Sequence, residues 1–241
     1  MDTYKFFFMT GGNCLIRENL ESVRKRVAAS AERVGRTDPI TLVAVTKNHP
    51  VEELMEAVAA GVTDVGENRV REALSKQESF PDNHVIWHLI GHLQTNKVKQ
   101  AVAHFDLIHS VDSVHLLEVI NKESGKIGKV QDILLQVNVA REESKTGMAV
   151  EVFPEICRRA AELEYVRVRG LMCMAPNFEN SEDARPIFRI ADALYEDMKD
   201  KFPNGQVRCL SMGMTHDFEI AIEEGANIVR VGTAIFGPRN Y

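Results

Sequence analysis

The stretch VRCLSMGMTHDFEIAIEEGANIVRVGT, residues 207–233, contains one complete unit of the fold that this sequence predicts. Its two short apolar runs, Val207–Met212 and Asn227–Val231, are typical of buried strands. Asp217–Glu224 between them has the spacing of an amphipathic helix, and Gly225 is suited to end that helix. A strand, a helix and a strand in succession indicate a right-handed crossover within a parallel sheet.

The same unit repeats along the chain from residue 41 onward. Six further runs are predicted as strands: Thr41–Thr46, Asp64–Gly66, His84–Ile90, Leu107–Val111, Asp132–Asn138 and Arg167–Met172. Helical patterns separate them over Val51–Ala60, Asn68–Glu78, Asn96–Ala103, Ser113–Lys122, Val150–Leu163 and Glu182–Lys201. A further helix, Ile16–Val34, precedes the first strand and ends at Gly35.

Eight strands favour a closed barrel, so we predict an α/β fold, a single (β/α)8 TIM barrel with an extra N-terminal helix. The alternative is an open, doubly wound sheet, but the first strand lacks the glycine-rich turn that a dinucleotide site in such a sheet needs. No linker rich in Pro, Gly or Ser divides the chain, and residues 15–241 are predicted to form one domain. Residues 1–14 fit no periodic pattern, and we expect a disordered or appended lead-in there.

Composition excludes several classes of protein. The formal net charge of −6 argues against broad electrostatic binding to nucleic acid. The apolar stretch Phe6–Met9 is too short for a signal sequence or a membrane span. The four cysteines, Cys14, Cys157, Cys173 and Cys209, show neither CxxC spacing nor a disulfide framework. We therefore expect a cytoplasmic protein with reduced thiols, and a monomer, since nothing in the sequence resembles an obligate interface.

Polar residues at the ends of three strands suggest a binding site. Ligands of such barrels bind at the C-terminal ends of the strands, and phosphate groups favour the loops after strands 7 and 8. Lys47 follows the first strand among apolar neighbours, where lost solvation would lower its amine pKa, as imine formation requires. Ser211-Met212-Gly213-Met214-Thr215 follows the seventh strand and offers hydroxyl and backbone N–H groups to an anion. Gly232-Thr233 follows the eighth, where Gly232 would let the backbone approach the same anion.

Alternation along the last strand places Arg230 on the same face as Gly232, pointing into the barrel mouth. An amine, two loops suited to bind a phosphate and an arginine that points into the barrel together predict pyridoxal 5′-phosphate (PLP), with Arg230 facing the pyridine nitrogen. Each part also has a simpler interpretation. Lys47 could be a solvated surface charge, residues 211–215 an ordinary helix cap, and Arg230 the partner of a carboxylate such as Glu67.

Two other groups of residues have spacings or positions that do not favour a ligand site. His88 and His92 have the i, i+4 spacing of zinc sites on helices, but they flank a strand end, so we predict no metal site. Lys145 lies in the loop after the fifth strand, where it neutralises Glu142 and Glu143; a contact with the cofactor or a partner is the lesser alternative.

The sequence resembles the PLP homeostasis protein family, also called the proline synthetase co-transcribed homologue family, whose fold is that of the barrel domain of alanine racemase. The resemblance extends from about Ile16 to Arg239, carried by Leu42–Lys47, Gly66–Asn68, Trp87–Gln94, Gln136–Asn138, Glu142–Gly147, Gly170–Pro176, Leu210–Thr215 and Arg230–Gly237. It implies that Lys47 forms a Schiff base with PLP. It also implies a set of cofactor contacts: Ser211, Thr215 and the backbones of Met212, Gly213, Gly232 and Thr233 at the phosphate, Arg230 at the ring nitrogen, and Asn68 nearby.

The resemblance further implies a function in intracellular vitamin B6 homeostasis. Members of the family are regarded as regulators or carriers of PLP without an established reaction, and PLP-dependent apo-enzymes are candidate partners. Thr46 and Thr215 stand where serine is usual, and both keep the hydroxyl. Asn48-His49 after the lysine is less usual and could alter access to the imine.

The alternative function is that of a PLP-dependent amino-acid racemase. Racemisation needs a second acid–base group on the opposite cofactor face, which the racemase family takes from a tyrosine of an additional β-domain. We expect that domain to be absent, and none of the tyrosines, Tyr4, Tyr165, Tyr195 and Tyr241, lies at a suitable strand end. A Schiff-base aldolase is a third interpretation, but no set of acid–base partners surrounds Lys47. We therefore predict a non-catalytic binding protein.

Overall fold

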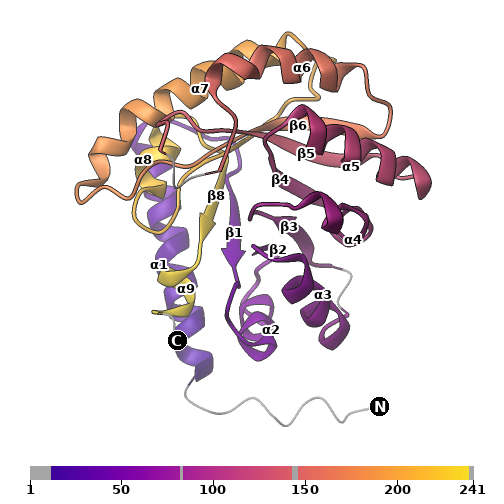
Figure 1. The fold of residues 1–241 in the computed structure, drawn as a ribbon. Coiled ribbons are helices and arrows are strands. Elements are labelled where there is room, and N and C mark those ends of the chain that lie inside the picture. Colours follow the sequence, from indigo (N-terminus) through magenta and orange to yellow (C-terminus); the bar gives the residue numbers. More distant parts are fainter. Residues whose placement is uncertain (1–11, 82–83, 143–145, 239–241) are drawn as a thin grey trace.

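The computed structural model describes residues 12–81, 84–142 and 146–238. Within these ranges, eight parallel strands form a closed barrel in chain order, with β8 paired to β1 (Figure 1). The strands are β1 (Thr41–Val45), β2 (Asp64–Glu67), β3 (Ile86–Leu89), β4 (Leu107–Val111), β5 (Gln131–Val137), β6 (Val166–Cys173), β7 (Cys209–Ser211) and β8 (Ile228–Val231).

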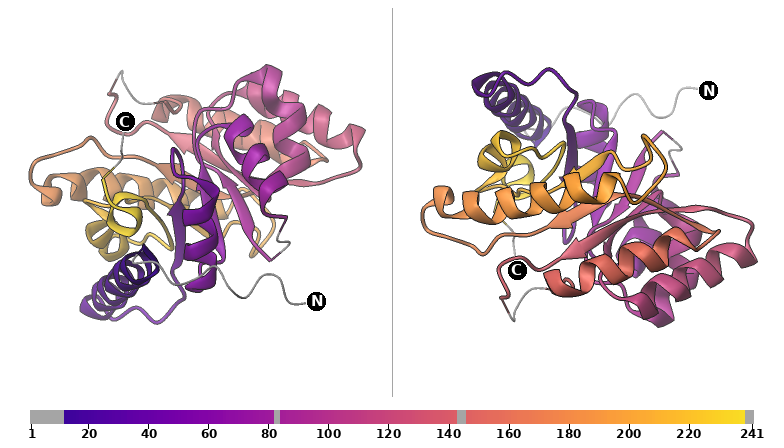
Figure 2. Two further views of the ribbon diagram at one scale, coloured as in Figure 1. Left: turned by 90° about the horizontal axis from the view of Figure 1, so that it is seen from below. Right: turned by 90° about the horizontal axis from the view of Figure 1, so that it is seen from above.

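Helices lie outside the strands (Figure 2). They are α1 (Gly12–Arg33), α2 (Val51–Ala59), α3 (Val70–Ser79), α4 (Val98–His104), α5 (Val114–Lys126), α6 (Phe153–Ala161), α7 (Arg185–Lys199), α8 (Phe218–Glu223) and α9 (Thr233–Phe236). Short 3-10 turns, η1 (Thr95–Lys97), η2 (Val150–Val152) and η3 (Ser181–Ala184), precede α4, α6 and α7. None of the helices in the described ranges is long and apolar enough to cross a bilayer.

The predicted barrel with an extra N-terminal helix is confirmed, with small shifts at the element ends. That helix, α1, packs against α2, α8 and α9 beside the junction of β8 and β1 (Figure 1). It begins at Gly12, four residues before the predicted start at Ile16. Of the predicted lead-in, residues 1–11 lie outside the described residues. The one-turn helix α9 was not predicted.

Side chains alternate between two apolar layers along each strand, because successive residues point to opposite faces. The larger layer fills the space between barrel and helices and includes Ala44 of β1, Leu54 of α2 and Phe188 of α7. A smaller cluster inside the barrel consists of Val43, Leu107, Leu134, Met172 and Ile228. The remaining interior positions toward the mouth carry polar side chains, and these form the candidate site and its support.

Candidate functional site

A cavity of about 290 Å³ lies at the C-terminal ends of the strands. Six of the eight strands, or the loops that follow them, contribute to its wall. The lining residues are Val45, Lys47, Asn68, Ile90, Met174, Met214, Thr215, His216, Arg230, Gly232 and Thr233. Two hydroxyls, an amine and a guanidinium therefore share one small cavity with apolar side chains. This composition is that of a site for a small polar ligand.

The end of β1 that carries Lys47 is anchored by a buried ion pair. Glu67, which is fully buried, accepts from the Thr46 hydroxyl at 2.5 Å and from the Lys76 ammonium at 2.6 Å. The same ammonium donates to the backbone oxygen of Thr46 at 2.6 Å. Burial raises the pKa of Glu67 above its ordinary value, although the charge of Lys76 and these hydrogen bonds lower it. Thr46, immediately before Lys47, is thus held through both its hydroxyl and its backbone oxygen.

The chain turns sharply after the partly buried Lys47. Asn48 adopts a left-handed backbone conformation with φ of 62°, a region that asparagine tolerates better than most residues. Its N–H donates to the Glu72 carboxylate at 2.6 Å. The His49 ring then packs against Phe236 of α9, with ring centroids 4.9 Å apart. Asn48 therefore holds the β1 loop against α3, and His49 holds it against α9 after β8.

Arg230 is the buried cation of the cavity. Its side chain is 3% exposed and donates to Ser211 Oγ at 2.5 Å and to the backbone oxygen of Cys173 at 3.0 Å. Burial lowers the pKa of Arg230 to about 10, so the guanidinium is still protonated at neutral pH. Because a guanidinium carries five N–H groups, these two bonds do not exhaust its capacity to donate. The predicted alternative, an ion pair of Arg230 with Glu67, is wrong, since Glu67 pairs with Lys76.

The loop after β7 is only partly arranged as predicted. Thr215 lines the cavity, but Ser211, Met212 and Gly213 do not. Ser211 is fully buried below the cavity, and its hydroxyl is used by Arg230. The N–H of Met212 donates to Ile228 O, and the backbone oxygen of Gly213 accepts from the N–H of Arg230. These three residues therefore support the site from beneath, where the prediction had them in contact with a phosphate.

Gly213 must be glycine for two independent reasons. Its φ of 91° is a conformation that side chains rarely adopt. A Cβ at this position would also lie 2.6 Å from the Ala221 Cβ atom. The turn continues with the N–H of Met214 donating to the Asp217 carboxylate at 2.6 Å, and this bond orders the segment that presents Thr215.

The loop after β8 brings Gly232 and Thr233 to the cavity beside Arg230. Gly232 precedes α9, and the first N–H groups of that helix, on Thr233 and Ala234, have no acceptor within it. A Cβ on Gly232 would approach the backbone oxygen of Val45 to 3.3 Å, so glycine keeps the two strand ends close. These N–H groups and the Thr233 hydroxyl are donors that suit an anion.

Several lining residues were missed by sequence reasoning. Val45, Ile90, Met174 and Met214 are apolar residues that a pattern does not separate from core positions. His216 is the missed residue that matters chemically, because it is an exposed imidazole at the wall of the cavity. Its position one residue after Thr215, at a predicted strand-to-helix loop, was a signal that could have identified it.

His88 and His92, which have the spacing of a zinc site, lie in two different environments. His88 is buried and contacts Asp64 and His109, whereas the exposed His92 lies 3.8 Å from Asp112. In the described ranges no group of three or more His, Cys, Asp or Glu side chains is arranged to hold a metal ion. Lys145 and its neighbours 143–144 lie outside the described residues.

A family model described as "Alanine racemase, N-terminal domain" matches residues 16–240. Among curated proteins, the pyridoxal phosphate homeostasis protein of Aquifex aeolicus is 44% identical over 225 residues, covering 93% of this chain and 98% of that protein. The protein of the same name from Escherichia coli is 37% identical over 231 residues, covering 94% and 97%.

Two solved structures define the likeness in three dimensions. PipY of Synechococcus elongatus, with PLP bound, superposes with a TM-score of 0.80 at 37% identity, covering 92% of this chain and 100% of that one. Alanine racemase from Bartonella henselae, with covalently bound pyridoxal phosphate, superposes with a TM-score of 0.73 at 15% identity, covering 94% and 59%. The second likeness extends to the fold alone.

Proposed function

Because the chain belongs to the pyridoxal phosphate homeostasis protein family, within the wider alanine racemase N-terminal domain family, we propose that it binds PLP in the cavity at the barrel mouth. The proposed attachment is a Schiff base on Lys47, and the proposed role is PLP homeostasis without a reaction of its own. One observation carries the proposal. A single cavity of about 290 Å³ is lined by an amine, two hydroxyls and a buried arginine, the groups that a phosphorylated pyridine aldehyde requires.

The residues fit this ligand at both of its ends. PLP, when bound, supplies an aldehyde that a lysine amine can capture. Thr215, Thr233 and the first N–H groups of α9 are the proposed phosphate contacts, where hydroxyls and an unused helix terminus favour an anion. Asn68, also in the wall, is the proposed polar contact beside the ring. Ser211, Met212 and Gly213 are proposed to act indirectly, by holding Arg230 and the β7 loop.

Arg230, at the proposed position of the PLP ring nitrogen, favours binding over catalysis. Arg230 can donate a hydrogen bond but cannot accept one, so it would hold an unprotonated ring nitrogen. A ring that stays neutral withdraws electrons less strongly than a pyridinium, which weakens carbanion chemistry. We further propose that the protein acts as a monomer in the cytoplasm, with PLP-dependent apo-enzymes as recipients of the cofactor.

Titration of the purified protein with PLP, followed by visible absorption, tests the binding site. The wild-type protein should develop a visible band that saturates with one PLP per chain. Lys47→Ala should lose that band, and Arg230→Ala should weaken binding at least about tenfold, the lower end of the cost of losing a hydrogen bond to a charged group. Lys99→Ala, a change at an exposed lysine of α4, is the control and should bind as the wild type does. An unchanged band in Lys47→Ala would refute the proposed attachment.

The alternative, an amino-acid racemase, is favoured by one observation, the imidazole of His216 at the cavity wall. Of the tyrosines, Tyr165 and Tyr195 do not line the cavity, and Tyr4 and Tyr241 lie outside the described residues. Proton NMR of amino acids incubated with PLP-loaded protein in deuterium oxide separates the two functions. We expect no exchange of the α-proton. Exchange that disappears in His216→Ala would establish the enzymatic alternative.

A further inference from the structure

The interior of the barrel contains a row of polar side chains from five strands. TIM-barrel interiors are filled mainly by branched apolar residues, and burial of polar groups is costly unless they are hydrogen-bonded. Here the row consists of Asp64 on β2, His88 on β3, His109 on β4, Ser211 on β7 and Arg230 on β8. His109 and Ser211 are fully buried, and His88 and Arg230 are 3% exposed.

Every member of this row is hydrogen-bonded to the next. The Arg230 guanidinium contacts Ser211 Oγ at 2.5 Å, and the same oxygen lies 3.0 Å from His109 Nδ1. His109 Nε2 lies 2.9 Å from His88 Nδ1, and His88 Nε2 lies 2.9 Å from Asp64 Oδ1. Both nitrogens of both imidazoles are used. We call this row the interior chain.

The two ends of the interior chain fix the direction of all its hydrogen bonds. Arg230 can only donate, so Ser211 Oγ accepts from it and turns its own proton to His109 Nδ1. His109 must then carry its proton on Nε2 and donate to His88 Nδ1. His88 in turn donates from Nε2 to the Asp64 carboxylate, which can only accept. Both histidines therefore donate from Nε2 and accept at Nδ1.

The reverse direction would leave the buried Ser211 hydroxyl proton without an acceptor, which is costly. A proton on His88 Nδ1 would force His109 to donate from Nδ1 toward Ser211. The Ser211 oxygen has two lone pairs and could accept from both His109 and Arg230, but the proton of this buried hydroxyl would then have no acceptor, since these two are its hydrogen-bond partners. Burial holds the pKa of His109 well below its usual range, and the Arg230 guanidinium lowers it further, so this imidazole does not take up a second proton.

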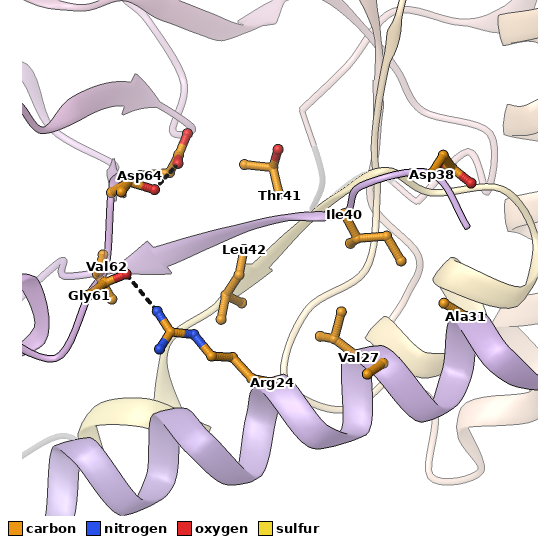
Figure 3. A pocket seen from close by; sticks show the side chains of 12 residues that line it. Arg24, Val27, Ala31, Asp38, Ile40, Thr41, Leu42, Gly61, Val62 and Asp64 are labelled. Atoms are coloured by element: carbon orange, nitrogen blue, oxygen red, sulfur yellow. Dashed lines mark hydrogen bonds between the residues drawn. The ribbon is translucent and has the colours of Figure 1, made fainter. Parts of the chain in front are cut away.

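The far end of the interior chain opens on a second cavity, at the N-terminal ends of β1 and β2. This cavity, about 440 Å³, is bounded by Arg24, Val27 and Ala31 of α1 and by Asp64 and its neighbours (Figure 3). The Asp64 side chain is 14% exposed. Burial by itself raises the pKa of Asp64, but hydrogen bonds from His88 and from the Thr63 hydroxyl outweigh it, and that pKa lies below its ordinary value. Asp64 is thus a carboxylate at neutral pH.

We propose that Asp64, at the opposite end of the barrel from the binding cavity, is a positioning residue that orients Arg230 through His88, His109 and Ser211. The carboxylate fixes the tautomer of each histidine in turn, and the last of them fixes the Ser211 hydroxyl as an acceptor for the guanidinium. Arg230 is then held in one orientation toward the ligand, and a change at the second cavity is transmitted to the first. This inference rests on the proposed function, in which Arg230 faces the PLP ring.

A double-mutant cycle on PLP affinity tests the proposal. Asp64→Ala and Ser211→Ala should each raise the PLP dissociation constant at least about fivefold, the lower end of typical coupling between sites. The double variant should bind no worse than the weaker single variant, because either change interrupts the same chain. Asp64→Asn should restore affinity, since its amide oxygen can accept from His88. Asp38→Asn, in the wall of the same second cavity but outside the chain, is the control and should bind as the wild type does.

Nitrogen-15 NMR of the imidazoles in PLP-free protein gives a readout that does not involve the cofactor. His88 and His109 should both be protonated on Nε2, with Nδ1 as acceptor, in the wild type and in Asp64→Asn. If the wild type binds PLP but the losses from Asp64→Ala and Ser211→Ala multiply, or Asp64→Ala binds normally, the positioning role is refuted and the proposed function stands. Histidines protonated on Nδ1 in the wild type would also refute the positioning role. This result does not depend on whether Asp64→Ala folds. Failure of the wild type to bind PLP would overturn the proposed function itself and this inference with it.

Discussion

Replacement of Lys76 by methionine should destabilise the end of β1 that presents Lys47. Lys76 is 6% exposed, and its ammonium donates to Glu67 and to the backbone oxygen of Thr46. In the variant, the fully buried Glu67 loses its partner cation. Removal of one partner of a buried ion pair costs about 3–5 kcal/mol. At about 2–4 °C per kcal/mol for a chain of this size, the midpoint of thermal unfolding should fall by about 6–20 °C.

The loss should depend on pH, with a sign that is fixed by Glu67. Burial already raises the pKa of this carboxyl in the native protein, and removal of Lys76 raises it further. A carboxyl with a raised folded pKa stabilises the fold below its unfolded pKa and loses that contribution as the pH rises through the folded pKa. The variant should therefore recover stability relative to the wild type between pH 7 and pH 5. One proton over two pH units limits the recovery to about 2.7 kcal/mol.

Thermal unfolding followed by circular dichroism at pH 7 and pH 5 measures both effects. Lys99→Met, at an exposed position of α4, should change stability by no more than about 0.5 kcal/mol. Addition of Glu67→Gln to Lys76→Met should abolish the pH-dependent part, because glutamine does not titrate. The reasoning is refuted if Lys76→Met unfolds within about 2 °C of the wild type at pH 7, or if its loss is equal at both pH values.

Two further predictions use the packing of single residues. A Cβ on Gly91 would lie 2.3 Å from the backbone oxygen of Asn68, so Gly91→Ala should displace the Asn68 segment of the cavity wall and weaken PLP binding at least about fivefold by titration. Gly128→Ala, where nothing lies within 4 Å, should leave affinity unchanged; equal affinity of both variants would contradict the close packing at Gly91. Burial raises the pKa of the Cys157 and Cys173 thiols to about 12, so iodoacetamide at pH 8 should label both in the unfolded protein and neither in the folded one by mass spectrometry. Rapid labelling of either thiol in the folded state would contradict its burial.

The barrel was predictable because local signals mark each of its units. The β7–α8–β8 segment shows this: its apolar runs give the strands, and Gly225, with φ of 105°, ends the helix as expected. Strand ends of a barrel converge, so Lys47 and Arg230, which are far apart in sequence, were expected at one mouth. Both line the same cavity.

The depth of each residue in the barrel could not be predicted from the sequence. Ser211 pairs in register with Ile228, one interior layer below Arg230, and this register depends on how neighbouring strands are staggered. The Ser211 hydroxyl, which the sequence predicts at the phosphate, accepts in the structure from the Arg230 guanidinium. The interior chain was missed for the same reason, because the contact between His109 and Ser211 joins residues 102 positions apart.

Borohydride reduction of the PLP-loaded protein, followed by peptide mapping, tests the central claim most directly. The account predicts a visible band that disappears on reduction and a pyridoxyl mass on the peptide that contains Lys47, with no adduct in Lys47→Ala. A reducible adduct on a different lysine, or no adduct at all, would contradict the assignment of this cavity as the PLP site.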